Sequence, residues 1–285
     1  MKRFFILATA AIVALASCAK TEVVYKNAPE QIAFKQITNV MTKASMSTDI
    51  KLGVTAHDEE NEPYFSNLPF THNGTAWANA AALWPYEGAL TFTVYAPAGT
   101  ASYNVNTEIL TIESVEAGEH VYYGTTRLSA EKPAKVEGVT PPINLTLKHI
   151  SAHLTANVDL GTAYELTGLT LKTPTTKGDV QVEYTLGASV TTKTKTTTTD
   201  VPLTSGTAVY VLPGNQTSIV VNFQQKAEPH QAYSKEINLY KTETETWEAN
   251  TKYVYNIGIN APEAITFTTE VAGWDSTVTE APSLN

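Results

Sequence analysis

Short segments in which apolar and polar residues alternate constrain the fold of this chain more than any other feature. A period of two places every second side chain on the same face of a β-strand. The pattern is clearest over residues 180–186, 219–223 and 253–259, and few segments show the longer period of a helix. Threonine is abundant and the 14 tyrosines outnumber the 8 phenylalanines, which favours strands because these residues are β-branched or aromatic. The sequence therefore predicts a mainly β protein whose antiparallel sheets bury one face.

The expected strands fall into two groups separated by a stretch that contains prolines and charges. Residues 128–142 include Glu131-Lys132-Pro133 and Thr140-Pro141-Pro142 in place of an alternating pattern, which is typical of a domain boundary. This predicts one β domain over 44–142 and a second over 143–285. The threonine-rich run at 191–199 is interpreted as a linker or an exposed hairpin. The segments expected to be strands are 31–37, 50–55, 90–95, 107–112, 120–124, 143–148, 149–158, 166–171, 180–186, 208–212, 218–224, 235–240, 252–259 and 264–271.

Residues 1–18 have the properties of an export leader that ends at a lipid-acceptor cysteine. Lys2 and Arg3 precede the apolar run Phe4–Leu15, which at about 12 residues is too short to span a bilayer. The segment Leu15-Ala16-Ser17-Cys18 resembles a bacterial lipobox, in which signal peptidase cuts before the cysteine and the sulfur is acylated. The alternative is an ordinary signal peptide with a cysteine near its cut. Cys18 is the only cysteine, so the chain forms no internal disulfide, and acyl chains on Cys18, palmitate among them, are expected to anchor it to a membrane.

Charge and side-chain chemistry argue against several classes of function. Removal of residues 1–18 takes away two basic and no acidic residues, which changes the formal net charge from −9 to −11. An acidic surface argues against nucleic-acid binding, because basic side chains supply most of that affinity. His149 and His153 lie four residues apart, which on a strand is about 13 Å and too far to share one metal ion. We expect no catalytic residues, no metal site and no cofactor; an enzyme would need titratable groups from distant segments to converge in space.

The order of several short motifs resembles the fimbrillin family, the FimA- and Mfa-like pilins of type V pili in anaerobic Gram-negative bacteria. The resemblance extends over most of the chain after the leader. Its landmarks are the lipobox ending at Cys18, Ile32-Ala33-Phe34, Thr42-Lys43-Ala44, Trp84-Pro85, the strand that ends at Ala96-Pro97, Leu147-Lys148-His149, Ala152-His153-Leu154, Tyr210-Val211-Leu212-Pro213, Trp247–Tyr253 and Val271-Ala272-Gly273-Trp274.

The resemblance implies two transthyretin-like antiparallel β-sandwiches and export to the outer membrane as a lipoprotein. It also implies that a protease removes the first strand and that a strand of another pilin subunit fills the groove by β-strand addition, building a cell-surface fimbrium that supports adhesion. On this chain, residues 19–43 would form the tether and removable strand, with Ile32 and Phe34 filling the groove. Cleavage would follow Lys43, where the family typically has arginine. Host or bacterial surface ligands are further implied partners, and the residues do not distinguish a shaft, tip or anchor subunit.

A second interpretation is a monomeric surface lipoprotein that binds glycans. The side chains of Trp77, Trp84, Trp247 and Trp274 are large flat surfaces that could stack on sugar rings. Three of them lie beside expected strands, so packing in the core is the competing interpretation of these tryptophans.

Overall fold

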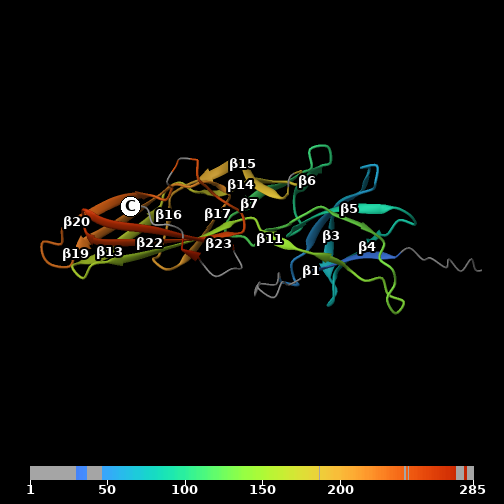
Figure 1. The fold of residues 1–285 in the computed structure, drawn as a ribbon, viewed down its shortest axis with the longest axis horizontal. Coiled ribbons are helices and arrows are strands. Elements are labelled where there is room, and N and C mark those ends of the chain that lie inside the picture. Colours follow the sequence, from blue (N-terminus) through green and yellow to red (C-terminus); the bar gives the residue numbers. More distant parts are fainter. Residues whose placement is uncertain are drawn as a thin grey trace, which may run out of the picture.

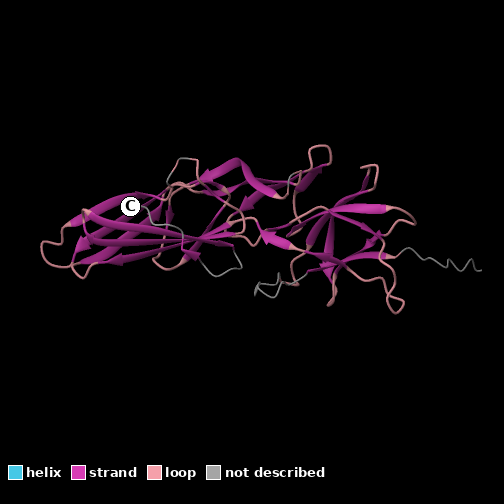
Figure 2. Ribbon diagram, in the orientation of Figure 1, coloured by secondary structure: helices cyan, strands magenta, loops and turns pink. Residues whose placement is uncertain are grey.

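The structure, a computed structural model, describes residues 30–36, 47–185, 187–240, 242, 244–273 and 279–280. Over these residues the chain forms strands, turns and loops without a helix, which confirms the predicted all-β sandwich class (Figure 2). The molecule is elongated, with strands of the N-terminal half at one end and strands of the C-terminal half at the other (Figure 1).

A sheet of nine strands forms the N-terminal lobe. The strands follow the order β10-β1-β4-β3-β2-β5-β8-β11, and β9 pairs with β5. Their inward side chains meet in one core that includes Phe34, Phe70 and Phe92. The strands are β1 Gln31–Gln36, β2 Leu52–His57, β3 Pro63–His72, β4 Trp77–Leu83, β5 Ala89–Ala96, β8 Tyr122–Gly124, β9 Leu128–Glu131, β10 Ile143–Leu145 and β11 Leu147–His149.

Two sheets pack face to face in the C-terminal lobe. One has the order β17-β12-β22-β23-β24 and the other β16-β13-β19-β20. Alternating side chains of both sheets, such as Leu154, Phe223 and Tyr255, fill the core between them, as expected of a β-sandwich. The strands are β12 Ala152–Leu160, β13 Tyr164–Leu171, β16 Val201–Pro202, β17 Ala208–Val211, β19 Ser218–Gln225, β20 Ala232–Asn238, β22 Thr251–Ala261, β23 Ala264–Gly273 and β24 Thr279–Glu280.

A further sheet joins the two halves of the chain. Its order is β15-β14-β7-β6, so β6 (Ala101–Asn104) and β7 (Ile109–Glu116) of the N-terminal half pair with β14 (Thr175–Glu183) and β15 (Ser189–Thr198) of the C-terminal half. Side chains from both halves, including Leu110, Val182 and Leu212, bury one another in a third core. The short strands β18 (Gly214–Asn215) and β21 (Thr246–Trp247) form a small separate sheet nearby.

Two strands that follow the boundary expected at 142/143 hydrogen-bond to the N-terminal lobe. β10 pairs with β1, and β11 pairs with β8. The chain then passes to the other lobe through Ile150 and Ser151, where the Ile150 N–H donates to the Val121 carbonyl at 2.9 Å and the Asn250 N–H to the Ser151 carbonyl at 3.1 Å. We therefore propose that the division between the lobes lies near residue 150 rather than at 142/143.

The structure also differs from several other local predictions made from the sequence. The threonine-rich run at 191–199 is not a linker, because β15 pairs antiparallel with β14 over nearly its whole length, as the hairpin interpretation predicts. The start of the 128–142 stretch forms β9. The β1–β10 and β12–β22 pairs are parallel, although the alternation predicts antiparallel sheets. Parallel neighbours need long connections, and both pairs join strands that lie far apart in the sequence.

Candidate functional site

Strand β1 lies inside the N-terminal sheet, between β10 and β4. It pairs in parallel with β10, where Phe34 stands opposite Ile143, and antiparallel with β4, where Phe34 stands opposite Trp77. Both ladders use the main chain of β1, so its removal would leave unpaired groups on two neighbouring strands. Alternation decides which side chains of β1 point inward, and these are Ile32 and Phe34.

The side chains of Ile32 and Phe34 fill the core of the N-terminal lobe. Both residues are 0% exposed. The ring of Phe34 meets Phe70 edge-to-face with the ring centroids 5.3 Å apart, and meets Phe92 in the same manner at 5.2 Å. Such aromatic pairs add to the stabilisation from buried area. The two residues that the sequence predicts to fill a groove are therefore buried in the structure.

The beginning of β1 is held by Glu30. Its carbonyl accepts a hydrogen bond from the Trp84 N–H at 2.7 Å, and its carboxylate forms an ion pair with the Lys135 ammonium at 2.9 Å. Lys43 lies outside the described residues, as does Cys18, so neither the cleavage site nor the lipidation site is part of the structure described.

A histidine and tyrosine cluster lies where the chain passes between the lobes. His149 is 8% exposed, and its ring centroid is 4.3 Å from that of Tyr122 and 5.8 Å from that of His120. The main-chain N–H of His149 donates to the Asn250 side-chain oxygen at 3.1 Å. Burial, and then the charges of His120 and His153, lower the pKa of His149 to about 4. The His149 ring is therefore neutral near pH 7. Among the described residues, no group of three or more His, Cys, Asp or Glu side chains could hold a metal ion.

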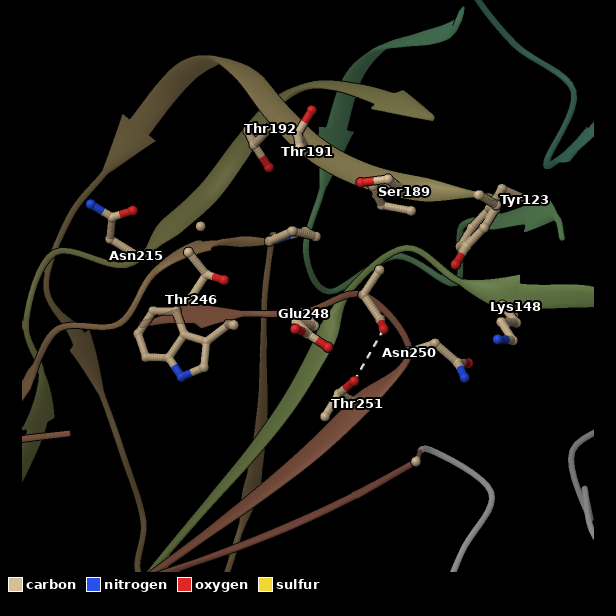
Figure 3. Close-up of a pocket in the computed structure, with 17 residues that line it drawn as sticks. Tyr123, Lys148, Ser189, Thr191, Thr192, Asn215, Thr246, Glu248, Asn250 and Thr251 are labelled. Atoms are coloured by element: carbon tan, nitrogen blue, oxygen red, sulfur yellow. Dashed lines mark hydrogen bonds between the residues drawn. The ribbon is translucent and has the colours of Figure 1, made fainter. Parts of the chain in front are cut away.

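An open cleft of about 800 Å³ lies beside this junction. Both lobes contribute to it: Tyr123 and Lys148 come from β8 and β11, Thr192 from β15, Asn215 from β18 and Glu248 from the segment after β21. Figure 3 shows Tyr123 and Lys148 at one end, Asn215 at the other, and Glu248 between them. Sequence reasoning missed this cleft, because its side chains come from segments far apart in the chain and share no motif.

The three tryptophans in the described part of the chain do not form a stacking surface. Trp77 and Trp84 are each 4% exposed and Trp247 is 1% exposed. The Trp247 indole N–H donates to the buried Tyr255 hydroxyl at 2.8 Å. Trp274 lies outside the described residues. Glycan stacking on Trp77, Trp84 or Trp247 is therefore wrong, and these residues pack in the cores because they lie on or beside alternating strands.

The geometry defines a class of protein: an elongated all-β molecule in which a separate front strand completes the N-terminal core. A family model described as fimbrillin-like matches residues 38–274. The chain belongs to this fimbrillin-like family. The described part of the chain contains no helix long and apolar enough to cross a bilayer.

Solved structures of fimbrial proteins have the same fold. A fimbrial protein from Bacteroides vulgatus is 15% identical with a TM-score of 0.54, and the match covers 86% of this chain and 99% of that one. A fimbrial assembly protein from Parabacteroides distasonis is 13% identical with a TM-score of 0.52, covering 89% of this chain and 99% of that one. At this level of identity the likeness concerns the fold alone. No curated protein matches the sequence.

Proposed function

We propose that this chain is a structural subunit of a cell-surface pilus, held at the outer membrane by lipid on Cys18 until proteolysis frees it for assembly. Cleavage after Lys43 would detach β1, and a strand of another subunit would take its place. The observation that carries the proposal is the position of β1: it completes a core and two ladders, and every other described strand follows it in the sequence. A single cut in residues 37–46 would leave β1 attached to the strands that follow it by non-covalent contacts only.

The energetics of such an exchange follow from the side chains that β1 buries. Full burial of a phenylalanine or isoleucine contributes about 1.5–3 kcal/mol, so Ile32 and Phe34 together contribute about 3–6 kcal/mol. The ladders to β10 and β4 add main-chain hydrogen bonds. A donor strand with apolar residues at the same alternate positions would recover both contributions by β-augmentation.

The arginine content of the chain bears on the protease. Arg127 is the only arginine after residue 18. Its guanidinium forms an ion pair with Glu108 and donates to the Tyr103 hydroxyl at 3.2 Å. An arginine-specific protease therefore has no site between β1 and β2, which supports a protease that accepts lysine.

Limited proteolysis tests the proposal. The chain is purified without lipid and treated with a lysine-specific protease, an arginine-specific protease or neither. We expect an early cut by the lysine-specific enzyme that creates an N-terminus at Ala44, followed by a ladder of oligomers on a gel run without boiling. Lys43→Ala should abolish the cut and the ladder, whereas Lys51→Ala, which changes an exposed lysine just before β2, should leave both intact. A cut chain that remains a monomer would rule out polymerisation by this route.

A further inference from the structure

Several polar side chains of the cleft between the lobes have no hydrogen-bond partner among the described residues. Tyr123 is only 4% exposed, yet its hydroxyl makes no hydrogen bond with a described residue. Burial raises the pKa of this hydroxyl to about 12, so it stays protonated and able to donate. The hydroxyl of Thr192 is also buried without a hydrogen-bond partner. Buried polar groups normally have a partner, so the Thr192 hydroxyl is an exception beside the cleft. The Tyr123 hydroxyl is able to bond to a ligand or water in the cleft.

Further donors and acceptors around the cleft are uncommitted. The side chains of Ser189, Asn215 and Glu248 are exposed and make no hydrogen bond with the described residues. Thr251 is already engaged, since its hydroxyl donates to the Ala249 carbonyl at 3.2 Å (Figure 3). The free groups are mainly hydroxyls and an amide, which both donate and accept hydrogen bonds. A ligand that matches them carries several hydroxyls of its own.

The charges of the cleft point to a ligand without net charge. Lys148 and Glu248 are its charged residues and are opposite in sign. Ala188, Val190 and Ala249 add small apolar surfaces between the polar groups. Such a mixture suits a molecule with hydroxyls at its edge and C–H groups on its faces. The volume of about 800 Å³ lies within the range of small-molecule sites.

We infer that the cleft binds a neutral oligosaccharide through hydrogen bonds from Tyr123 and Asn215. This mode differs from tryptophan stacking and does not depend on pilus assembly. An extended peptide added to the outer edge of β15 is the competing occupant, because β15 pairs on one side only. The uncommitted side-chain hydroxyls on both walls favour the oligosaccharide, and Lys193 on β15 is typical of an edge strand protected against pairing.

The test is binding by the purified protein, residues 19–285, which contain every described strand. An array of neutral gluco-, galacto-, manno-, xylo- and chito-oligosaccharides identifies a bound sugar, and titration calorimetry measures its affinity. Tyr123→Phe removes only the hydroxyl and should weaken binding about 3- to 10-fold, the usual effect of one lost neutral hydrogen bond. Asn215→Ala, at an exposed position, should weaken it to a similar extent.

Tyr184→Phe is the matched control. Tyr184 is also buried, at 8% exposed, and its hydroxyl also lacks a partner, but it lines a different hollow. This variant should bind the sugar as the unchanged protein does. The inference is overturned if none of the oligosaccharides binds, if Tyr123→Phe and Asn215→Ala both leave the affinity unchanged, or if an unstructured threonine- and valine-rich peptide binds and the sugars do not.

Discussion

Replacement of Phe34 by alanine should loosen β1 specifically, without a comparable effect on the rest of the fold. Phe34 is 0% exposed and touches the rings of Phe70 and Phe92. Truncation of a buried phenylalanine costs about 3–5 kcal/mol, from lost transfer energy and the cavity that remains. Because Phe34 belongs to β1, most of this cost should appear as weaker retention of that strand once the chain is cut.

The assay uses the only cysteine as a label. A lipid-free chain beginning at Cys18, with Lys20→Arg and Lys26→Arg, carries a fluorophore on that thiol. Cleavage at Lys43 by the lysine-specific protease then leaves the label on the fragment that contains β1. Dilution of the cut protein, followed by separation on a sizing column, measures how much fragment remains bound. At about 1.4 kcal/mol per tenfold change, 3–5 kcal/mol predicts a dissociation constant for Phe34→Ala that is about two to three and a half orders of magnitude higher.

Phe223→Ala provides the matched control. Phe223 is also 0% exposed and lies 5.5 Å from the ring of Tyr164 and 5.3 Å from that of Tyr233, but it belongs to the C-terminal core. This variant should lower the denaturant midpoint of the protein and leave retention of the fragment within about twofold, since distant sites act independently. Equal retention of the fragment in the Phe34→Ala and unchanged proteins would refute the reasoning.

Two further predictions concern the junction and the packing of the sheets. Burial lowers the pKa of His149 to about 4, so its contribution to stability is present above pH 6.5 and is lost as pH falls from 6.5 toward 4. Between pH 7 and pH 5 this should lower the free energy of unfolding by roughly 1–3 kcal/mol. Unfolding measured at both pH values should show a smaller decrease in stability for His149→Gln than for His230→Gln, which changes an exposed histidine. Equal decreases would contradict the assignment. In β2, Gly53→Ala would drive a Cβ into the buried ring of Tyr95, whereas Gly118 has open space around it. Gly53→Ala should cost about 1–3 kcal/mol in denaturant unfolding, and Gly118→Ala should cost far less; similar losses at both positions would show that the close approach does not matter.

Local alternation was sufficient to predict which side chains of many strands point inward. Ile32 and Phe34 are buried as the pattern of 31–37 indicates, and the same holds for Tyr253 and Ile257 in β22. Alternation assigns faces but not neighbours. It therefore could not predict that β1 lies beside β10, or that β7 pairs with β14 across the two halves.

The sites that depend on such strand neighbours could not be predicted from the sequence either. His149 meets His120 and Tyr122 only because β11 pairs with β8. The hydroxyl of Tyr123 and the amide of Asn215 border one cleft because the joining sheet brings β15 against the segment after β21. None of these residues forms a motif with its sequence neighbours, so a single sequence carries no local signal for them.

The parallel pair formed by β1 and β10 determines when the N-terminal lobe can be finished. A chain is made and exported from its front end, so residues 31–36 appear first, while their neighbours at 143–145 follow roughly 110 residues later. Contacts across so long a stretch form slowly, since the intervening chain must first be closed into a loop. The strand that appears earliest is thus among the last to be secured, and until that moment its position between β4 and β10 is open to any strand that can reach it.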